Sequence, residues 1–173
     1  EPQHFDFLRD VVLKDRRGPG IFRIWSGASS SGEEAYSMAM VLAEHRTGGP
    51  WEVFGSDISL TVLARAQAGV YSQERISGIP QAYLRKYCLK GVRSQEGKLL
   101  IDSKLKQRVS FAQVNLTLPI TGVGEFDAIF LRNVMIYFDA ETKRKVVENM
   151  LPSLKPGGYF IVGHSESLNG ITS

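Results

Sequence analysis

The chain has 173 residues and a formal net charge of +3, with 43% hydrophobic and 23% charged residues. This length allows one domain with a sizeable core, and the composition is ordinary for a globular protein. No apolar stretch approaches the roughly 20 residues of a membrane-spanning helix, and the start EPQHFDFLRD does not resemble a signal peptide. A single cysteine, Cys88, excludes an internal disulfide or a cysteine-rich metal site, and it fits a cytoplasmic location.

Short apolar segments alternate with helical patterns along the chain. The predicted strands are residues 21–26, 51–58, 109–116, 126–133 and 159–166. Helices are predicted over 33–45, over 60–68 after an N-cap at Ser59, and over 140–154 after an N-cap at Asp139. This alternation favours a mainly parallel sheet with helices on both faces, which binds ligands at the carboxyl ends of its strands.

Residues 70–107 break this alternation. A short helix is predicted over 79–87, and the segments YCLKG and KLLID are expected to pair as strands around the turn VRSQE. Residues 85–108 carry eight Lys and Arg against two acidic residues, which favours an acidic partner. A solvated face of mixed charge explains the same pattern equally well.

The loop after the first predicted strand is rich in small residues and leads into two acids. The sequence SGASSSG (26–32) permits a ligand to approach the backbone closely, yet it is neither a G-x-G-x-x-G fingerprint nor a P-loop. Glu33 and Glu34 suit the start of a helix but would repel a pyrophosphate. A nucleotide-like ligand with a positive centre, such as S-adenosylmethionine, fits this pattern; the alternative is that both acids only stabilise the helix.

Polar residues also close other predicted strands. Asp57 lies where dinucleotide-binding folds hold ribose hydroxyls, although helix capping explains it too. Asn115 and Leu116 together are able to hydrogen-bond and sandwich an adenine. Arg132 and Asn133 end an apolar strand with groups that need partners or solvent.

Two further residues are candidates for the substrate site. Arg23 is a charge inside an apolar strand, where it needs a partner or a cleft. Tyr137 either contributes a hydroxyl to the site or packs in the core. The three histidines are not at metal-ligand spacings, so no metal is expected.

Several of these segments together resemble the CheR family of chemoreceptor methyltransferases, which are S-adenosylmethionine-dependent protein-glutamate O-methyltransferases. The segments are RIWSGASSSGEEAYSMAM, FGSDIS, FAQVNL, FDAIFLRNVMIYFD and LKPGGYFIVGHSES. The resemblance implies a class I methyltransferase fold, Rossmann-like, with a small antiparallel β-subdomain inserted at about 87–109. It also implies that residues 1–173 are the catalytic domain, without the family's N-terminal helical domain.

The resemblance implies roles for individual residues. Glu33 would contact the methionine end of the cofactor, Asp57 the ribose, and Asn115 with Leu116 the adenine. The full implied cofactor set is Ser26, Gly27, Ala28, Glu33, Glu34, Asp57, Ile58, Asn115, Leu116, Arg132 and Asn133. Arg23 and Tyr137 would orient the substrate glutamate near the transferred methyl, without acting as acid or base.

The resemblance also implies partners. The expected substrate is the cytoplasmic domain of a chemoreceptor, whose C-terminal peptide the basic β-subdomain docks in some family members, and the expected product is S-adenosylhomocysteine. Neither nucleic acid nor membrane insertion is expected. A cofactor-binding sensor or adaptor with little turnover remains an alternative. Nucleic-acid methylation is disfavoured, because the sequence lacks an N/D-P-P-Y/F motif.

Overall fold

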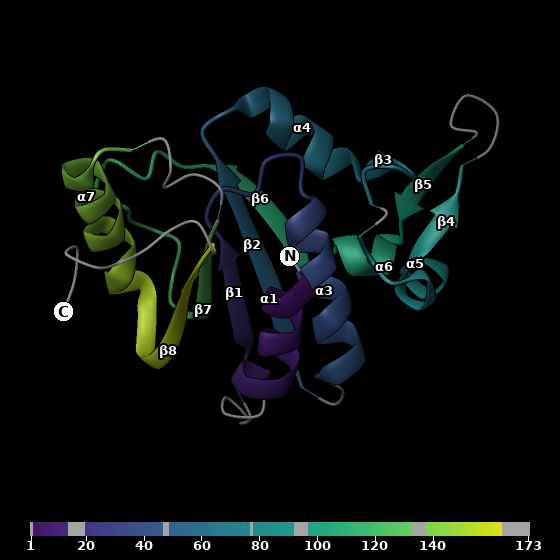
Figure 1. The fold of residues 1–173 in the computed structure, drawn as a ribbon, viewed down its shortest axis with the longest axis horizontal. Helices are drawn as coiled ribbons and strands as arrows, with labels where there is room; N and C mark the ends of the chain where they lie inside the picture. The colour runs from purple at the N-terminus through teal and green to yellow at the C-terminus, as the bar shows by residue number, and fades with distance from the viewer. Residues whose placement is uncertain are drawn as a thin grey trace.

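A computed structural model describes residues 2–13, 20–46, 49–76, 78–91, 97–132 and 138–163 (Figure 1). Its elements are α1 (Pro2–Phe7), η1 (Leu8–Val12), β1 (Phe22–Ser26), α3 (Glu33–His45), β2 (Trp51–Asp57), α4 (Leu60–Ala68), β3 (Val70–Ser72), α5 (Gln81–Tyr87), β4 (Cys88–Lys90), β5 (Lys98–Ile101), α6 (Ser103–Lys106), β6 (Val109–Gln113), β7 (Phe126–Leu131), α7 (Ala140–Met150), η4 (Leu151–Ser153) and β8 (Leu154–Val162). The caps predicted at Ser59 and Asp139 are confirmed, since each side chain accepts a backbone N–H of its helix.

The main sheet has five strands in the order β6-β2-β1-β7-β8, and every neighbouring pair is parallel. The predicted parallel sheet is therefore confirmed. The chain passes from β1 outward to β2 and β6 on one side, and to β7 and β8 on the other. The strand order reverses between β1 and β7, and such a reversal opens a ligand-binding crevice at the carboxyl ends of the strands.

Each face of the main sheet has its own hydrophobic core. Phe22 and Ile24 of β1 pack into the core under α1 and α3, whereas Trp25 packs on the opposite face with Val146 and Met150 of α7. Successive side chains of a strand point to opposite faces, which explains this division. Figure 1 shows α3 and α7 on either side of the sheet, as the predicted layering requires.

A second sheet of three antiparallel strands lies beside the main one, in the order β3-β5-β4. The pairing of β4 with β5 confirms the hairpin predicted from YCLKG and KLLID. The third strand, β3, was not predicted from the sequence, and it pairs with β5 on the side opposite β4. In Figure 1 this sheet stands at the opposite end of the molecule from α7.

Several predicted boundaries were wrong. The helix predicted to reach residue 154 ends at Met150, because Pro152 has no N–H for another helical bond and forms a 3-10 turn instead. The strand predicted from residue 159 already begins at Leu154, with an irregular register against β7. The strand predicted over 109–116 ends at Gln113. Residue 133 and residues 164–166 lie outside the described part of the chain.

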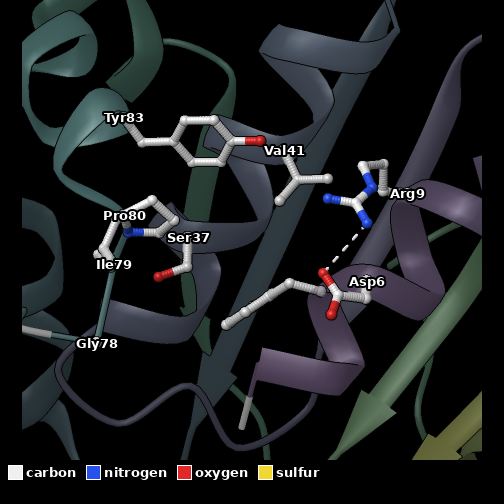
Figure 2. A pocket seen from close by; sticks show the side chains of 9 residues that line it. Asp6, Arg9, Ser37, Val41, Gly78, Ile79, Pro80 and Tyr83 are labelled. Atoms are coloured by element: carbon white, nitrogen blue, oxygen red, sulfur yellow. Dashed lines mark ion pairs between the residues drawn. The ribbon is translucent and has the colours of Figure 1, made fainter.

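A small pocket lies between α1, α3 and the start of α5 (Figure 2). Its volume is about 100 Å³, and its lining is Phe5, Asp6, Arg9, Ser37, Val41, Gly78, Ile79, Pro80 and Tyr83. Arg9 and Asp6 form an ion pair at 3.4 Å on one rim, opposite Tyr83 and Pro80. Of the predicted site residues that the structure describes, none lines this pocket. Within the described ranges, no helix has the length and apolar character needed to cross a bilayer.

The Asp139 cap provides a test of the fold. Its carboxylate accepts the Thr142 N–H at 2.8 Å, and this bond holds the pKa of Asp139 below its ordinary value. We expect Asp139→Ala to lower the Tm by about 2–4 °C at neutral pH. Because the pKa is lowered on folding, the stabilisation is present above the ordinary Asp pKa and is lost as the pH falls through the lowered value. Thermal unfolding at a series of pH values measures this difference, with Glu148→Ala in the same helix as the control. An equal Tm loss in both variants would contradict the assignment of the cap.

Candidate functional site

The loop of residues 27–32 crosses the carboxyl ends of three strands. The Gly27 N–H donates to the carbonyl of Phe130 on β7 at 2.8 Å, and the Ser29 N–H donates to the carbonyl of Ser56 on β2 at 2.8 Å. The loop follows directly on β1, and these two bonds attach it to β2 and β7, the strands on either side of β1. It lies where the strand order reverses, which is the expected location of a ligand site.

Two buried side chains of the main sheet also hold the loop in place. The indole N–H of Trp25 donates to the Ser56 hydroxyl at 2.8 Å, and that hydroxyl donates to the carbonyl of Gly27 at 2.9 Å. Trp25 and Ser56 are fully buried, so these bonds are shielded from water. Ser56 was not among the residues predicted from the sequence; its one local signal is a serine within a largely apolar strand.

Two loop residues adopt left-handed backbone conformations. Gly32, the N-cap of α3, has φ of +95°, and a Cβ there would lie 2.9 Å from the hydroxyl of Tyr71. Ser30 has φ of +49°, which is uncommon for a residue other than glycine. Its N–H donates to Asp57 Oδ2 at 3.0 Å, and this bond holds the conformation. Such conformations persist where surrounding contacts enforce them.

Asp57 joins the loop to the start of α4. One carboxylate oxygen accepts the Ser30 N–H and the other accepts the Ser59 N–H, both at 3.0 Å. The N-cap of α4 is Ser59, so Asp57 does not cap the helix itself. Each carboxylate oxygen accepts one of these bonds and has a second lone pair that a ligand hydroxyl is able to use.

Glu34 forms a largely buried ion pair with Arg132 at the end of β7. Arg132 Nη1 lies 2.7 Å from Glu34 Oε2, and the Ser26 hydroxyl donates to Glu34 Oε1 at 3.0 Å. The Arg132 side chain is 6% exposed and that of Glu34 is 20% exposed. Burial raises the pKa of Glu34, although Arg132 and Ser26 act in the opposite direction. This pair fastens the first turn of α3 to the centre of the sheet.

Glu33 has different partners from Glu34: it contacts Ser31 and Arg75. Its carboxylate accepts the Ser31 hydroxyl on one oxygen and faces Arg75 Nη1 at 3.4 Å on the other. Tyr71 on β3 donates its hydroxyl to the Ser31 carbonyl at 2.5 Å. Neither Tyr71 nor Arg75 was predicted, since both are about 40 residues further along the chain and no motif marks them.

These residues surround an open hollow of about 430 Å³. Its lining is Ala28, Ser29, Ser30, Glu33, Glu34, Asp57 and Arg132. The buried Ser29 hydroxyl has no hydrogen-bond partner among the described residues, so a ligand group is able to satisfy it. Three carboxylates against one guanidinium favour a ligand with positive charge over a phosphate.

The structure does not bring the predicted adenine residues into the hollow. Ile58 is exposed, and its carbonyl accepts a bond from Gln113. Asn115 Oδ1 accepts the backbone N–H and the hydroxyl of Thr117, while Leu116 is buried in the core beneath α7. These residues follow β2 and β6, which are neighbouring strands, so they lie on the same edge of the sheet as the hollow.

Arg23 lies in the amino-terminal half of β1, opposite Glu52 in the register with β2. Its guanidinium pairs with Glu52, donates to the carbonyls of Glu125 at 2.9 Å and Val123 at 3.0 Å, and lies 4.3 Å from the centre of the Phe126 ring. These contacts give the Arg23 guanidinium the partners that a charge inside a strand needs, so it does not have to face a cleft. The structure therefore does not bring Arg23 to the hollow.

Asn133 and Tyr137 lie outside the described residues. Within the described part of the chain, no group of three or more His, Cys, Asp or Glu side chains is placed to hold a metal ion.

The family model described as the CheR methyltransferase, SAM binding domain, matches residues 1–173. This chain belongs to that family. A chemotaxis protein methyltransferase from Escherichia coli K12 is 41% identical over 98% of this chain, and one from Pseudomonas aeruginosa is 40% identical over 96% of it. The chain spans about 59–61% of the length of these two CheR-type relatives.

Two solved methyltransferase structures have a similar fold. The citrinin polyketide synthase CMeT domain has a TM-score of 0.59 at 19% identity, covering 93% of this chain and 33% of that one. The glycopeptide N-methyltransferase MtfA has a TM-score of 0.55 at 15% identity, covering 91% and 52%. At these identities the likeness concerns the fold, and it confirms the predicted methyltransferase architecture.

The buried Glu34 makes stability depend on pH. Its pKa is raised on folding, so its contribution to the free energy of unfolding is complete below the ordinary Glu value of 4.5 and is lost as the pH rises through the raised value. In Glu34→Gln, Arg132 loses its ion pair with Glu34, which adds a loss that does not depend on pH. We therefore expect the stability of Glu34→Gln relative to the wild type to increase with pH above 4.5. Urea unfolding from pH 4 to 8 measures this, with Glu148→Gln as the control, and a relative stability that falls with pH would contradict the raised pKa.

The contacts of Arg23 predict a stabilising role. Arg23→Ala removes an ion pair, two hydrogen bonds to carbonyls and a cation–π contact, so we expect the free energy of unfolding to fall by about 1–3 kcal/mol. Urea unfolding measures this, with the exposed Arg85→Ala on α5 as the control. A variant that loses methyl transfer but keeps its full stability would instead place Arg23 at the substrate.

Proposed function

We propose that this chain binds S-adenosylmethionine in the strand-end hollow and catalyses methylation of glutamate side chains on a chemoreceptor. The observation that carries the proposal is the charge of the hollow, where Glu33, Glu34 and Asp57 outnumber one arginine. The cofactor has an ammonium and a sulfonium and no phosphate, so its charge is complementary to that lining. Membership of the CheR family and the chemotaxis relatives support the same assignment.

The described residues offer places for the ribose and for the ammonium end of this cofactor. Asp57 has lone pairs left for the ribose hydroxyls, and the Ser29 hydroxyl has no partner among the described residues. Glu33 and Glu34 in the first turn of α3 are the acceptors for the ammonium group. We assign Ile58, Asn115 and Leu116 to the adenine side, because they continue the same edge beyond Asp57.

The proposed reaction requires little acid–base catalysis by the protein. When bound, the cofactor supplies a methyl group on a sulfonium, which a glutamate carboxylate oxygen takes as the carbon–sulfur bond breaks and its electron pair returns to sulfur. No proton moves, so no described residue has to act as a general base. The task of the protein is to hold the two reactants in line, and such alignment supplies up to roughly 7–11 kcal/mol.

The loop between β1 and α3 suits this positioning task. Two of its N–H groups donate to carbonyls of β7 and β2, its Gly27 carbonyl accepts the Ser56 hydroxyl, and Asp57 holds Ser30 in place. A loop organised in this way does not have to rearrange when charge changes during the reaction. Tyr137, outside the described residues, remains our proposal for orienting the substrate glutamate, whereas we no longer propose Arg23 for that role.

We propose the cytoplasmic domain of a chemoreceptor as the partner, which places the reaction in the cytoplasm. The small sheet β3-β5-β4 is our candidate for docking the C-terminal peptide of the receptor. It carries the exposed basic residues Arg85, Lys90 and Lys98 on or next to its strands, and β4 is an edge strand to which an extended peptide is able to add.

Calorimetric titration with S-adenosylhomocysteine tests the cofactor site. We expect Asp57→Ala to weaken binding about 10- to 100-fold, because hydrogen bonds to a charged group are lost. Asp102→Ala is the matched control, since Asp102 also accepts a backbone N–H two residues further on, at α6 and away from the hollow. Equal affinity in the wild type and Asp57→Ala would contradict the site.

Methyl transfer from labelled S-adenosylmethionine to a chemoreceptor cytoplasmic domain, measured with the intact protein, tests the activity. We expect alkali-labile label on receptor glutamates. Binding without any transfer would instead identify a cofactor-binding sensor or adaptor.

A further inference from the structure

The small sheet contacts the loop of the hollow directly. Tyr71 on β3 is 4% exposed, and its hydroxyl donates to the carbonyl of Ser31 at 2.5 Å. Burial raises the pKa of Tyr71, so the hydroxyl stays protonated and remains a donor at neutral pH. Its ring packs edge-on against Tyr36 of α3, with 6.1 Å between the ring centres. The strand β3 therefore supports the loop at Ser31, through the Tyr71 hydroxyl.

Arg75 makes a second contact from the turn that follows β3. Its Nη1 lies 3.1 Å from the Ser31 hydroxyl oxygen and 3.4 Å from Glu33 Oε2. The turn itself is closed by a bond from the Arg75 N–H to the Ser72 carbonyl at 3.2 Å. Since the Ser31 hydroxyl donates to the other oxygen of Glu33, both carboxylate oxygens have a partner.

We propose that Arg75 and Tyr71 are positioning residues for the cofactor: they hold Ser31 and Glu33 in the arrangement that receives the ammonium end. This inference rests on the proposed function of the hollow. Neither residue is in the lining of the hollow, so both act through Ser31 and Glu33. The small sheet is thereby a structural part of the cofactor site as well as the candidate docking element.

The loop needs such support for two physical reasons. Ser30 and Gly32, on either side of Ser31, both have left-handed conformations that the chain does not favour by itself. The Glu33 side chain is 30% exposed, so without Arg75 its carboxylate has more freedom to rotate toward solvent, although the Ser31 hydroxyl still bonds one oxygen. A carboxylate held before the ligand arrives does not lose that freedom on binding, and affinity rises accordingly.

The ligand experiment compares Arg75 with an arginine that lacks these contacts. We expect Arg75→Ala to raise the Kd for S-adenosylhomocysteine and the KM for S-adenosylmethionine about two- to fivefold, as for an exposed ion pair, with kcat unchanged. Arg75→Lys is expected to restore part of the affinity. Arg65→Ala on α4 removes the same charge from an exposed position without these contacts and is expected to leave the Kd unchanged. An equal effect of Arg75→Ala and Arg65→Ala would overturn the proposal.

A double-mutant cycle shows whether Arg75 acts through Glu33. In a Glu33→Gln background, we expect Arg75→Ala to cause no further increase in Kd, because the carboxylate that it positions is already gone. A full additional loss would mean that Arg75 acts on the ligand by another route, and the positioning role would be rejected.

Amide hydrogen exchange of the ligand-free protein separates this inference from the proposed function. We expect Arg75→Ala and Tyr71→Phe to speed exchange at the amides of residues 30–33 by about twofold to tenfold, while exchange in α7 stays unchanged. Failure of the wild type to bind either cofactor form would reject the proposed function, whatever the exchange result. Wild-type exchange rates in the loop of both variants would reject the positioning role, even if the cofactor binds.

Discussion

Three carboxylates share one edge of the sheet, and the surrounding structure supplies each of them with donors. Glu34 pairs with the buried Arg132, Glu33 faces Arg75, and Asp57 accepts two backbone N–H groups. Without these partners, like charges so close together would repel one another and disfavour the fold. The donors come from β7, from the segment after β3 and from the loop itself, so the whole edge is organised around this cluster of charge.

This arrangement explains why the loop is built from small residues. Its backbone bonds to β2 and β7 at the same time, and Gly32 packs where a Cβ would be 2.9 Å from Tyr71 and Ala66. Larger side chains would separate the loop from the strands and from the small sheet. A phosphate-binding loop uses similar backbone geometry, but here the acids reverse the charge that the ligand must carry. The fold is that of methyltransferases, and we propose that the acids favour a ligand with positive charge.

The sequence predicted most of this fold from local signals. The helix over 33–45, the caps at Ser59 and Asp139 and the alternation of strands with helices all follow from residues close to one another in the chain. Pro152 was a local signal that we overlooked, and it accounts for the early end of α7. Arg23 could not be placed from the sequence, because its partner Glu52 depends on the register between two strands. Tyr71 and Arg75 were missed for the same reason, since only the folded chain brings the small sheet to the loop.

A crystal structure of this chain with S-adenosylhomocysteine tests the central claim most directly. We expect the ribose hydroxyls to lie within hydrogen-bond distance of the Asp57 carboxylate. We also expect the amino group to lie against Glu33 or Glu34, with the Ser29 hydroxyl bonded to the ligand. A ligand bound elsewhere, for example between α1 and α5 in the pocket of Figure 2, would contradict it.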